Sequence, residues 1–187
     1  PKVSDLAFFL SAEYKPWEWL SLRPGVRTFI VADYDAPIAI PSVLTKFKLT
    51  KHMDLRLSYA YGFRSPTLQE LYFSFHNDNH DIDGNPDLKA EYSHNITGSV
   101  AYRVLHSEKI HLTTTLSGFY NDFRDKISLA QNVDIPNYNT YYNIDRYKTV
   151  GGSLENSLSW GGLRANLNVS LIGRYNRYAT GDKSMPR

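Results

Sequence analysis

The sequence contains no cysteine among its 187 residues, so neither a disulfide framework nor a thiolate metal site holds this fold together. Long apolar runs are missing as well. Nowhere does the chain approach the roughly 18 consecutive apolar residues that a membrane-spanning helix requires, and the mean hydropathy is −0.43. A helical membrane protein is therefore excluded.

Charge of one sign is not in excess, because 21 Lys and Arg stand against 19 Asp and Glu. The basic field that binding to duplex nucleic acid requires is absent, so no nucleic-acid partner is expected. The first residues, Pro1 to Ser4, lack the charged and apolar regions of a signal peptide. The chain is accordingly expected to be mature, cytoplasmic or excised from something larger, and nothing in its composition marks an internal domain boundary.

Helical periodicity is nearly missing, whereas alternation with a period of two residues recurs from end to end and is typical of half-buried strands. The clearest strand follows residue 54. Its alternate residues on one face are Leu55, Leu57, Tyr59, Tyr61 and Phe63, and those on the other are Arg56, Ser58, Ala60, Gly62 and Arg64. Because a slip of one residue would exchange the two faces, the register is well specified. The sequence predicts an all-β fold.

Strand length and the connections narrow the fold class. We expect about eight strands of roughly 9 to 15 residues, which are longer than those of most soluble proteins. Short connections at 15–18, 50–54, 105–108 and 161–162 alternate with long ones at 31–41, 64–91 and 124–145. Outer-membrane barrels place short turns on the periplasmic side and long loops outside, whereas a soluble sandwich does not. This pattern predicts antiparallel transmembrane β-barrel strands in the lipid of a bacterial outer membrane.

An outer-membrane barrel also carries aromatic girdles at both edges of its apolar belt. The residues expected to form them are Tyr14, Trp17, Trp19, Tyr120, Tyr141, Tyr142, Trp160 and Tyr175. Polar faces rich in Ser, Asn, Thr, Arg and Glu are expected to line a wet lumen.

Three sequence blocks lie in order between residues 59 and 93. They are Gly62-Phe63-Arg64-Ser65-Pro66-Thr67, Glu70-Leu71-Tyr72 and Gly84-Asn85-Pro86-Asp87-Leu88-Lys89. This segment resembles the TonB-dependent receptor family, and the resemblance continues in 118–122, 125–127, 141–143 and 151–155. The chain departs from the family pattern at Ala90, where proline is usual. The blocks are specific for the family and carry little information about the substrate.

The resemblance implies a barrel of about 22 strands closed around an N-terminal plug. It also implies that plug and extracellular loops capture a small-molecule ligand and that the TonB complex drives import through an N-terminal box. Plug, TonB box and C-terminal strands are not visible here, so residues 1–187 are expected to be a partial barrel. The alternative is a complete eight-stranded barrel that acts as a structural or adhesion protein.

Heme receptors of this family resemble the chain in one further respect, a histidine in the loop between the blocks. His76 and His80 lie there, and an imidazole is a good axial ligand of heme iron. Tyr72 and Phe75, together with Phe73, are expected to pack against the porphyrin. The alternatives are a ferric siderophore as the transported ligand, or two solvated loop histidines. Arg64 either carries a binding charge or anchors the departure of the loop.

Calcium binding and catalysis have less support in the sequence. Asn79, Asp81, Asp83 and Gly84 partly match a calcium loop, but Ala90 occupies the position that requires a bidentate Glu, and Glu91 comes one place late. A solvated acidic loop has the same composition. No nucleophile stands in a recognisable catalytic setting, so the chain is not expected to be an enzyme, and no resident cofactor or metal other than transported heme iron is expected.

Overall fold

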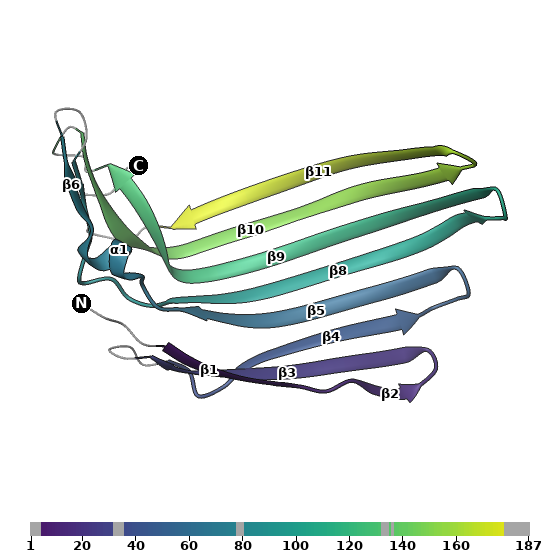
Figure 1. Ribbon diagram of the computed structural model, residues 1–187, viewed down its shortest axis with the longest axis horizontal. Coiled ribbons are helices and arrows are strands. Elements are labelled where there is room, and N and C mark those ends of the chain that lie inside the picture. Colours follow the sequence, from purple (N-terminus) through teal and green to yellow (C-terminus); the bar gives the residue numbers. More distant parts are fainter. Residues whose placement is uncertain (1–4, 32–35, 78–80, 132–134, 136, 178–187) are drawn as a thin grey trace.

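The structure is a computed structural model that describes residues 5–31, 36–77, 81–131, 135 and 137–177. Most of its strands lie side by side in one curved sheet (Figure 1). They are β1 (Asp5–Ser11), β2 (Tyr14–Trp17), β3 (Leu20–Val31), β4 (Ile40–Lys48), β5 (Met53–Arg64), β8 (Glu91–His106), β9 (Ile110–Gln131), β10 (Tyr138–Trp160) and β11 (Leu163–Arg177). Helix α1 (Leu68–Tyr72) and strands β6 (Ser74–His76) and β7 (Asp81–Asp83) lie between β5 and β8. No helix in the described ranges is long and apolar enough to cross a membrane.

The strands follow the chain order across the sheet, and every long neighbouring pair is antiparallel. The all-β antiparallel prediction is confirmed. Within the described residues β1 pairs only with β3 and β11 only with β10, so the sheet is open at both edges. The closed eight-stranded barrel is therefore not formed, and the strands have the arrangement of a barrel wall.

The register separates two chemically different faces. One row across the sheet consists of Leu55, Val100, Leu116, Leu154 and Val169, each paired with the next. The row beside it, on the opposite face, consists of Arg56, Ser99, Ser117, Ser153 and Ser170. Apolar side chains of the first face are widely exposed, as Leu171 at 79% shows. Such a face needs lipid against it, so we call it the lipid-facing wall and its opposite the lumen face.

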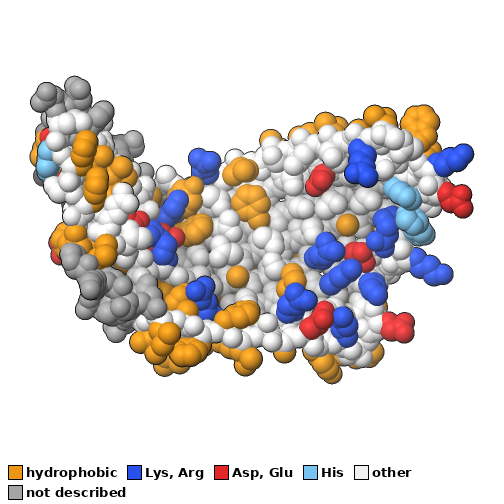
Figure 2. All heavy atoms as spheres, in the orientation of Figure 1, with side chains coloured by type: hydrophobic (Ala, Val, Ile, Leu, Met, Phe, Trp, Pro, Cys, Tyr) orange, Lys and Arg blue, Asp and Glu red, His pale blue; other side chains and the backbone are white. Residues whose placement is uncertain are grey.

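Charged side chains of the lumen face gather near the short turns (Figure 2). Asp54 is buried there and lies 3.6 Å from Lys46 and 3.3 Å from Arg103. A row of serines with a few paired charges agrees with the wet lumen that the sequence predicted.

Two predicted connections were wrong. The turn expected at 15–18 is mostly strand β2, and the chain turns at Glu18 and Trp19 instead. The long loop expected at 124–145 is replaced by continuations of β9 and β10, in which Ile127 pairs with Asn143 and Leu129 with Tyr141. An extension of the strand before this loop to Leu129 was the alternative expectation, and β9 does continue past that residue. Asp125, which has a φ of 51°, interrupts the alternation, and beyond it both strands bend (Figure 1). Because this irregularity interrupts the alternation of apolar and polar residues, the sequence pattern did not predict the strands beyond it.

Most of the aromatic residues expected at the belt edges are exposed, among them Tyr14, Trp17, Trp19, Trp160 and Tyr175. Trp17 and Trp19 stack with ring centroids 5.2 Å apart at the short-turn end. Tyr141 is different, because it packs against buried residues of the β5–β8 connection. It therefore serves the loop rather than a girdle.

Candidate functional site

The connection from β5 to β8 is closed by Arg64. Its Nη1 donates to both carboxylate oxygens of Glu70, at 3.0 and 2.8 Å, and its Nη2 donates to Glu91 at 3.3 Å. Glu91 also accepts a hydrogen bond from the backbone N–H of Ile127 at 3.1 Å. One guanidinium thus joins the start of the connection, helix α1, and the start of β8, which is the geometry expected of an anchor.

Helix α1 is only five residues long and begins with a capping box. The backbone N–H of Glu70 donates to the Thr67 hydroxyl at 3.2 Å, and the N–H of Thr67 donates back to the Glu70 carboxylate at 2.8 Å. Partial burial acts to raise the pKa of Glu70, but hydrogen bonds from Arg64 and Thr67 outweigh it and hold the pKa below its ordinary value. The Thr67-x-x-Glu70 spacing is the sequence signal from which this helix start could have been predicted.

The block that begins at Gly84 docks on α1. The N–H of Gly84 donates to Phe73 O at 2.6 Å, and the N–H of Asn85 donates to Glu70 O at 2.8 Å. A Cβ at Gly84 would lie 2.6 Å from the backbone of Leu71 and of Tyr72. Only glycine permits this approach, which explains why this position of the block needs glycine.

Two asparagines fix the same block on β9 and β10. Asn85 Nδ2 donates to Tyr141 O at 2.9 Å. Asn143 accepts from Lys89 N at 2.8 Å and donates to Lys89 O and Asp125 O, at 3.0 and 2.7 Å. Leu71, Leu88 and Ile127 are 3–7% exposed and form a small core beside Tyr141. The blocks that carried the family resemblance therefore build a platform for the loop.

The segment between these anchors is a hairpin of β6 and β7 that contains His76. Its Nδ1 lies 3.1 Å from Asp81 Oδ1, and its Nε2 lies 3.2 Å from Asp83 Oδ1 and 2.9 Å from Ser74 Oγ. Strand β7 also pairs with β10 in parallel, so that Tyr138 lies opposite Asp81. Burial, followed by the nearby Asp83 carboxylate, raises the pKa of Tyr138. Sequence reasoning missed Tyr138 because it fell within an expected loop.

The predicted aromatic contacts lie on the other side of the hairpin. Phe75 pairs with Ile82, whereas its neighbour His76 pairs with Asp81, and successive side chains of a strand point to opposite faces. The rings of Phe73 and Phe75 stack with centroids 6.3 Å apart, and Tyr72 is 56% exposed. His76 and Phe75 are thus close in the chain but not brought together on one face. His80 lies outside the described residues.

The carboxylates of the partial calcium motif already have a partner, since Asp81 and Asp83 both contact His76. Across the described ranges, no group of three or more His, Asp or Glu residues is arranged to hold a metal ion. Asn79, the first position of that motif, is outside those ranges.

Similar sequences come from proteins named for hemoglobin binding or hemoglobin-haptoglobin utilization. The chain is 38% identical over 82 residues to hemoglobin and hemoglobin-haptoglobin-binding protein C of Haemophilus influenzae, an alignment of 44% of this chain and 7% of that protein. It is 36% identical over 98 residues to hemoglobin-haptoglobin utilization protein B of Neisseria meningitidis serogroup C, or 51% of this chain and 12% of that protein. The chain therefore matches only a small part of the length of these relatives.

Solved structures share the fold. The hemophore receptor HasR of Serratia marcescens, solved as a double mutant with its hemophore HasA and heme, gives a TM-score of 0.77 at 15% identity, covering 91% of this chain and 34% of that chain. The FrpB iron transporter of Neisseria meningitidis (F5-1 variant) gives 0.70 at 21% identity, covering 98% and 28%. The family whose description is TonB dependent receptor-like, beta-barrel matches residues 1–187. Since this match spans the chain from end to end, the protein belongs to the TonB-dependent receptor-like β-barrel family.

Proposed function

We propose that this chain is the part of an outer-membrane receptor that supplies one side of the barrel wall and a ligand-capturing extracellular loop for TonB-dependent uptake of heme iron. The names of the similar proteins, which refer to hemoglobin binding and to hemoglobin-haptoglobin utilization, support heme as the source of iron. The lipid-facing wall supports the location in the outer membrane. The TonB complex would act through a region of the receptor that lies outside this sequence.

The pairing of His76 with Asp81 carries the proposal. A histidine that binds a metal almost always donates its other ring N–H to a carboxylate, which fixes the ring and makes the free nitrogen a better ligand. Asp81 stands 3.1 Å from Nδ1 and would supply that contact. Nε2 would then give up its contacts with Ser74 and Asp83 and bind the heme iron instead.

The aromatic residues would act after a movement of the hairpin. Tyr72, the last residue of α1, and Phe75, the middle residue of β6, are both exposed, and their rings offer a surface for the porphyrin. Since Phe75 and His76 occupy opposite faces, one porphyrin would contact both only at the end of the hairpin or after the strand turns. His80 would be the second candidate for the iron. The receptor would work as a transporter without catalysis and without a resident cofactor.

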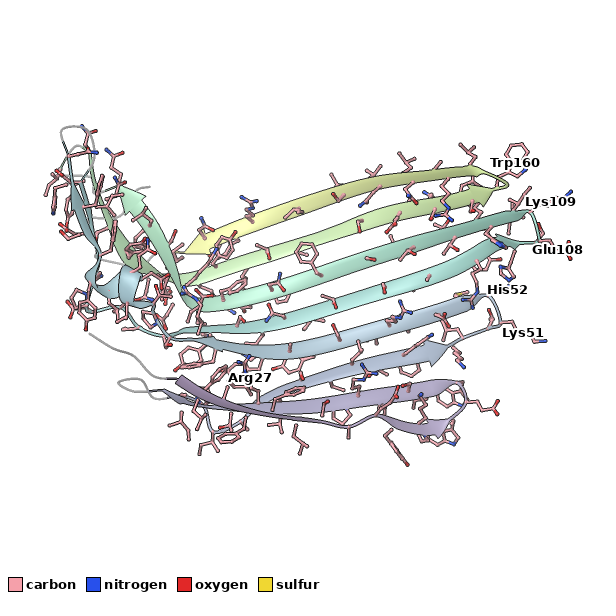
Figure 3. The ribbon with its side chains drawn as sticks, viewed as in Figure 1. Arg27, Lys51, His52, Glu108, Lys109 and Trp160 are labelled. Carbon is pink, nitrogen blue, oxygen red and sulfur yellow. The ribbon has the colours of Figure 1, made fainter. Side chains whose placement is uncertain are left out.

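Heme titration of the intact receptor, followed through the Soret band, tests the axial ligand. We expect His76→Ala, His80→Ala or the double variant to change the Soret spectrum and to weaken heme binding by at least about tenfold. Asp81→Asn should weaken it by about 10- to 100-fold, because the carboxylate that orients the imidazole is lost. The matched control is His52→Ala, at the opposite end of the sheet in a short turn (Figure 3).

Unchanged spectra and affinities in the double variant would eliminate the axial-ligand role. A receptor that leaves the heme spectrum unaltered, and instead binds a ferric siderophore, would replace heme by the siderophore as the transported ligand.

A further inference from the structure

The lipid-facing wall has an apolar belt of defined height. On β10 the residues of this face from Val150 to Trp160 carry no charge, and neither do their partners on β9 and β11. Eleven residues of strand span about 36 Å, or about 27 Å along the membrane normal at a tilt of about 40°. This height equals the apolar band of an outer-membrane barrel, so the next residues on this face lie at the level of the lipid headgroups.

Four charged residues occupy that level. Lys148 pairs with Asp122, and Arg146 pairs with Arg124, directly beyond the pair of Val150 and Tyr120. We call these four the outer-edge cluster. Arg146 donates to Asp122 through Nε at 3.1 Å and Nη2 at 2.6 Å, and Lys148 Nζ lies 3.7 Å from the same carboxylate. Three cations against one carboxylate give the cluster a net charge of +2.

Aromatic side chains surround the cluster on the same face. The Lys148 ammonium lies 5.7 Å from the centroid of the Tyr120 ring, and Tyr175 pairs with Lys148 from β11. On the other side His94 pairs with Asp122, and the ring of Tyr61 lies 5.0 Å from that of His94. Tyrosines mark the membrane interface in barrels. Their presence places the outer-edge cluster among the headgroups independently of the length of strand in the apolar belt.

The opposite edge of the wall lacks such a cluster. There the paired residues of the same face are apolar or aromatic, namely Trp160 with Leu163, Met53 with Tyr102 and Leu20 with Phe47. The charges at that end include Lys51, Glu108 and Lys109, which lie in the turns (Figure 3). Cations among the paired residues of the lipid-facing wall are thus concentrated at the loop end of the described strands.

We infer that the outer-edge cluster binds the phosphate groups of an anionic glycolipid in the outer leaflet. Arg146 and Lys148 keep 38% and 29% of their side-chain surface exposed, while Asp122, at 13%, holds the Arg146 guanidinium against the wall. An oriented guanidinium and an ammonium are the groups that recognise phosphate. Because the cluster points away from the lumen, its ligand comes from the membrane. The inference rests on the proposed outer-membrane location and not on the identity of the transported ligand.

The test is retention of lipid A by the intact receptor, measured by native mass spectrometry from nanodiscs of phosphatidylcholine and lipid A. We expect lipid A to be retained at least tenfold more than lipid A from which the phosphates have been removed. Arg124→Gln with Lys148→Gln, which leaves the Arg146–Asp122 pair in place, should abolish that preference, and Lys148→Gln alone should reduce it. Arg56→Gln with Arg164→Gln removes the same charge from the lumen face and should change nothing.

Equal retention of the two lipids by the unaltered receptor overturns the inference, and so does an undiminished preference in the double variant. Heme titration of the same double variant separates the two proposals. Normal heme binding with lost lipid preference supports the outer-edge site alone, whereas a receptor that binds lipid A but no heme contradicts only the proposed substrate.

Discussion

Docking of the loop on α1 requires a residue without a Cβ at position 84, where glycine has only a hydrogen atom. The backbones of Leu71 and Tyr72 stand where a Cβ would be, and backbone atoms cannot move aside as the end of a flexible side chain can. The N–H groups of Gly84 and Asn85 bond to the same helical turn. The docking of the Gly84–Lys89 block on α1 therefore depends on the absence of a side chain at this position.

Replacing this glycine should release the loop without unfolding the wall. We expect Gly84→Ala to weaken docking by about 1–3 kcal/mol, because the added methyl group forces the block away from α1. Limited proteolysis should then cut residues 72–90 faster, while the strands stay resistant. Gly162→Ala is the matched control, since a Cβ there meets nothing within 4 Å. Equal cleavage rates in the two variants would contradict this account.

At the scale of elements, prediction succeeded where alternation was long and unbroken, as in β5, β8 and the β10–β11 hairpin. It failed at β6, β7 and α1, because elements of three to five residues are too short to show a period. It failed again beyond Asp125, where one residue with positive φ breaks the pattern inside a continuous strand. The family blocks located the loop correctly, but only the structure separates residues that support it from residues that face a ligand.

Helix α1 should be sensitive to acid. The pKa of Glu70 is lowered in the folded state, so its contribution to docking is present above the ordinary glutamate value of 4.5 and is lost as pH falls through the depressed value. Hydrogen exchange of the α1 and Gly84–Leu88 amides should therefore accelerate, relative to the strands, as pH falls below the ordinary glutamate value of 4.5 and through the lowered pKa of Glu70.

Glu70→Gln isolates this carboxylate. The variant keeps a side chain that can cap the helix but loses the charge that pairs with Arg64. Its loop should exchange faster than that of the unaltered receptor at neutral pH and should show less additional loosening in acid. The same steep acid response in both proteins would assign the effect to other groups.

The whole molecule is organised by the two faces of one sheet. Neighbouring residues of β10 face different solvents, as Leu154 on the lipid-facing wall and Glu155 on the lumen face show. Most apolar side chains of the described residues are therefore not buried by the chain itself, and at the proposed location in the outer membrane lipid would cover those of the lipid-facing wall. Alternation predicted this division of faces well, because it depends only on the period of the strand.

A charge placed on the lipid-facing wall tests that division. Leu154→Arg, near the middle of the belt, should destabilise the intact receptor in lipid vesicles by about 2–4 kcal/mol. Glu155→Arg, one residue away on the lumen face, should cost much less, because its side chain meets water and polar groups. The measurement is the urea midpoint of folding into vesicles, followed by tryptophan fluorescence. Similar midpoints for both variants would mean that the faces are assigned incorrectly.

The way the loop is fastened has a consequence for how such receptors diversify. Its ends are held by Arg64, α1 and the Gly84–Lys89 block. The hairpin between them joins β10 through backbone pairing of β7, which most residues other than proline permit, and through the hydrogen bond of Tyr138 with Asp83. We therefore expect residues 73–83 to tolerate exchange for the corresponding segment of a related protein without redesign of the wall. On the proposed function, changes confined to this hairpin would alter the captured ligand while the barrel wall stays the same.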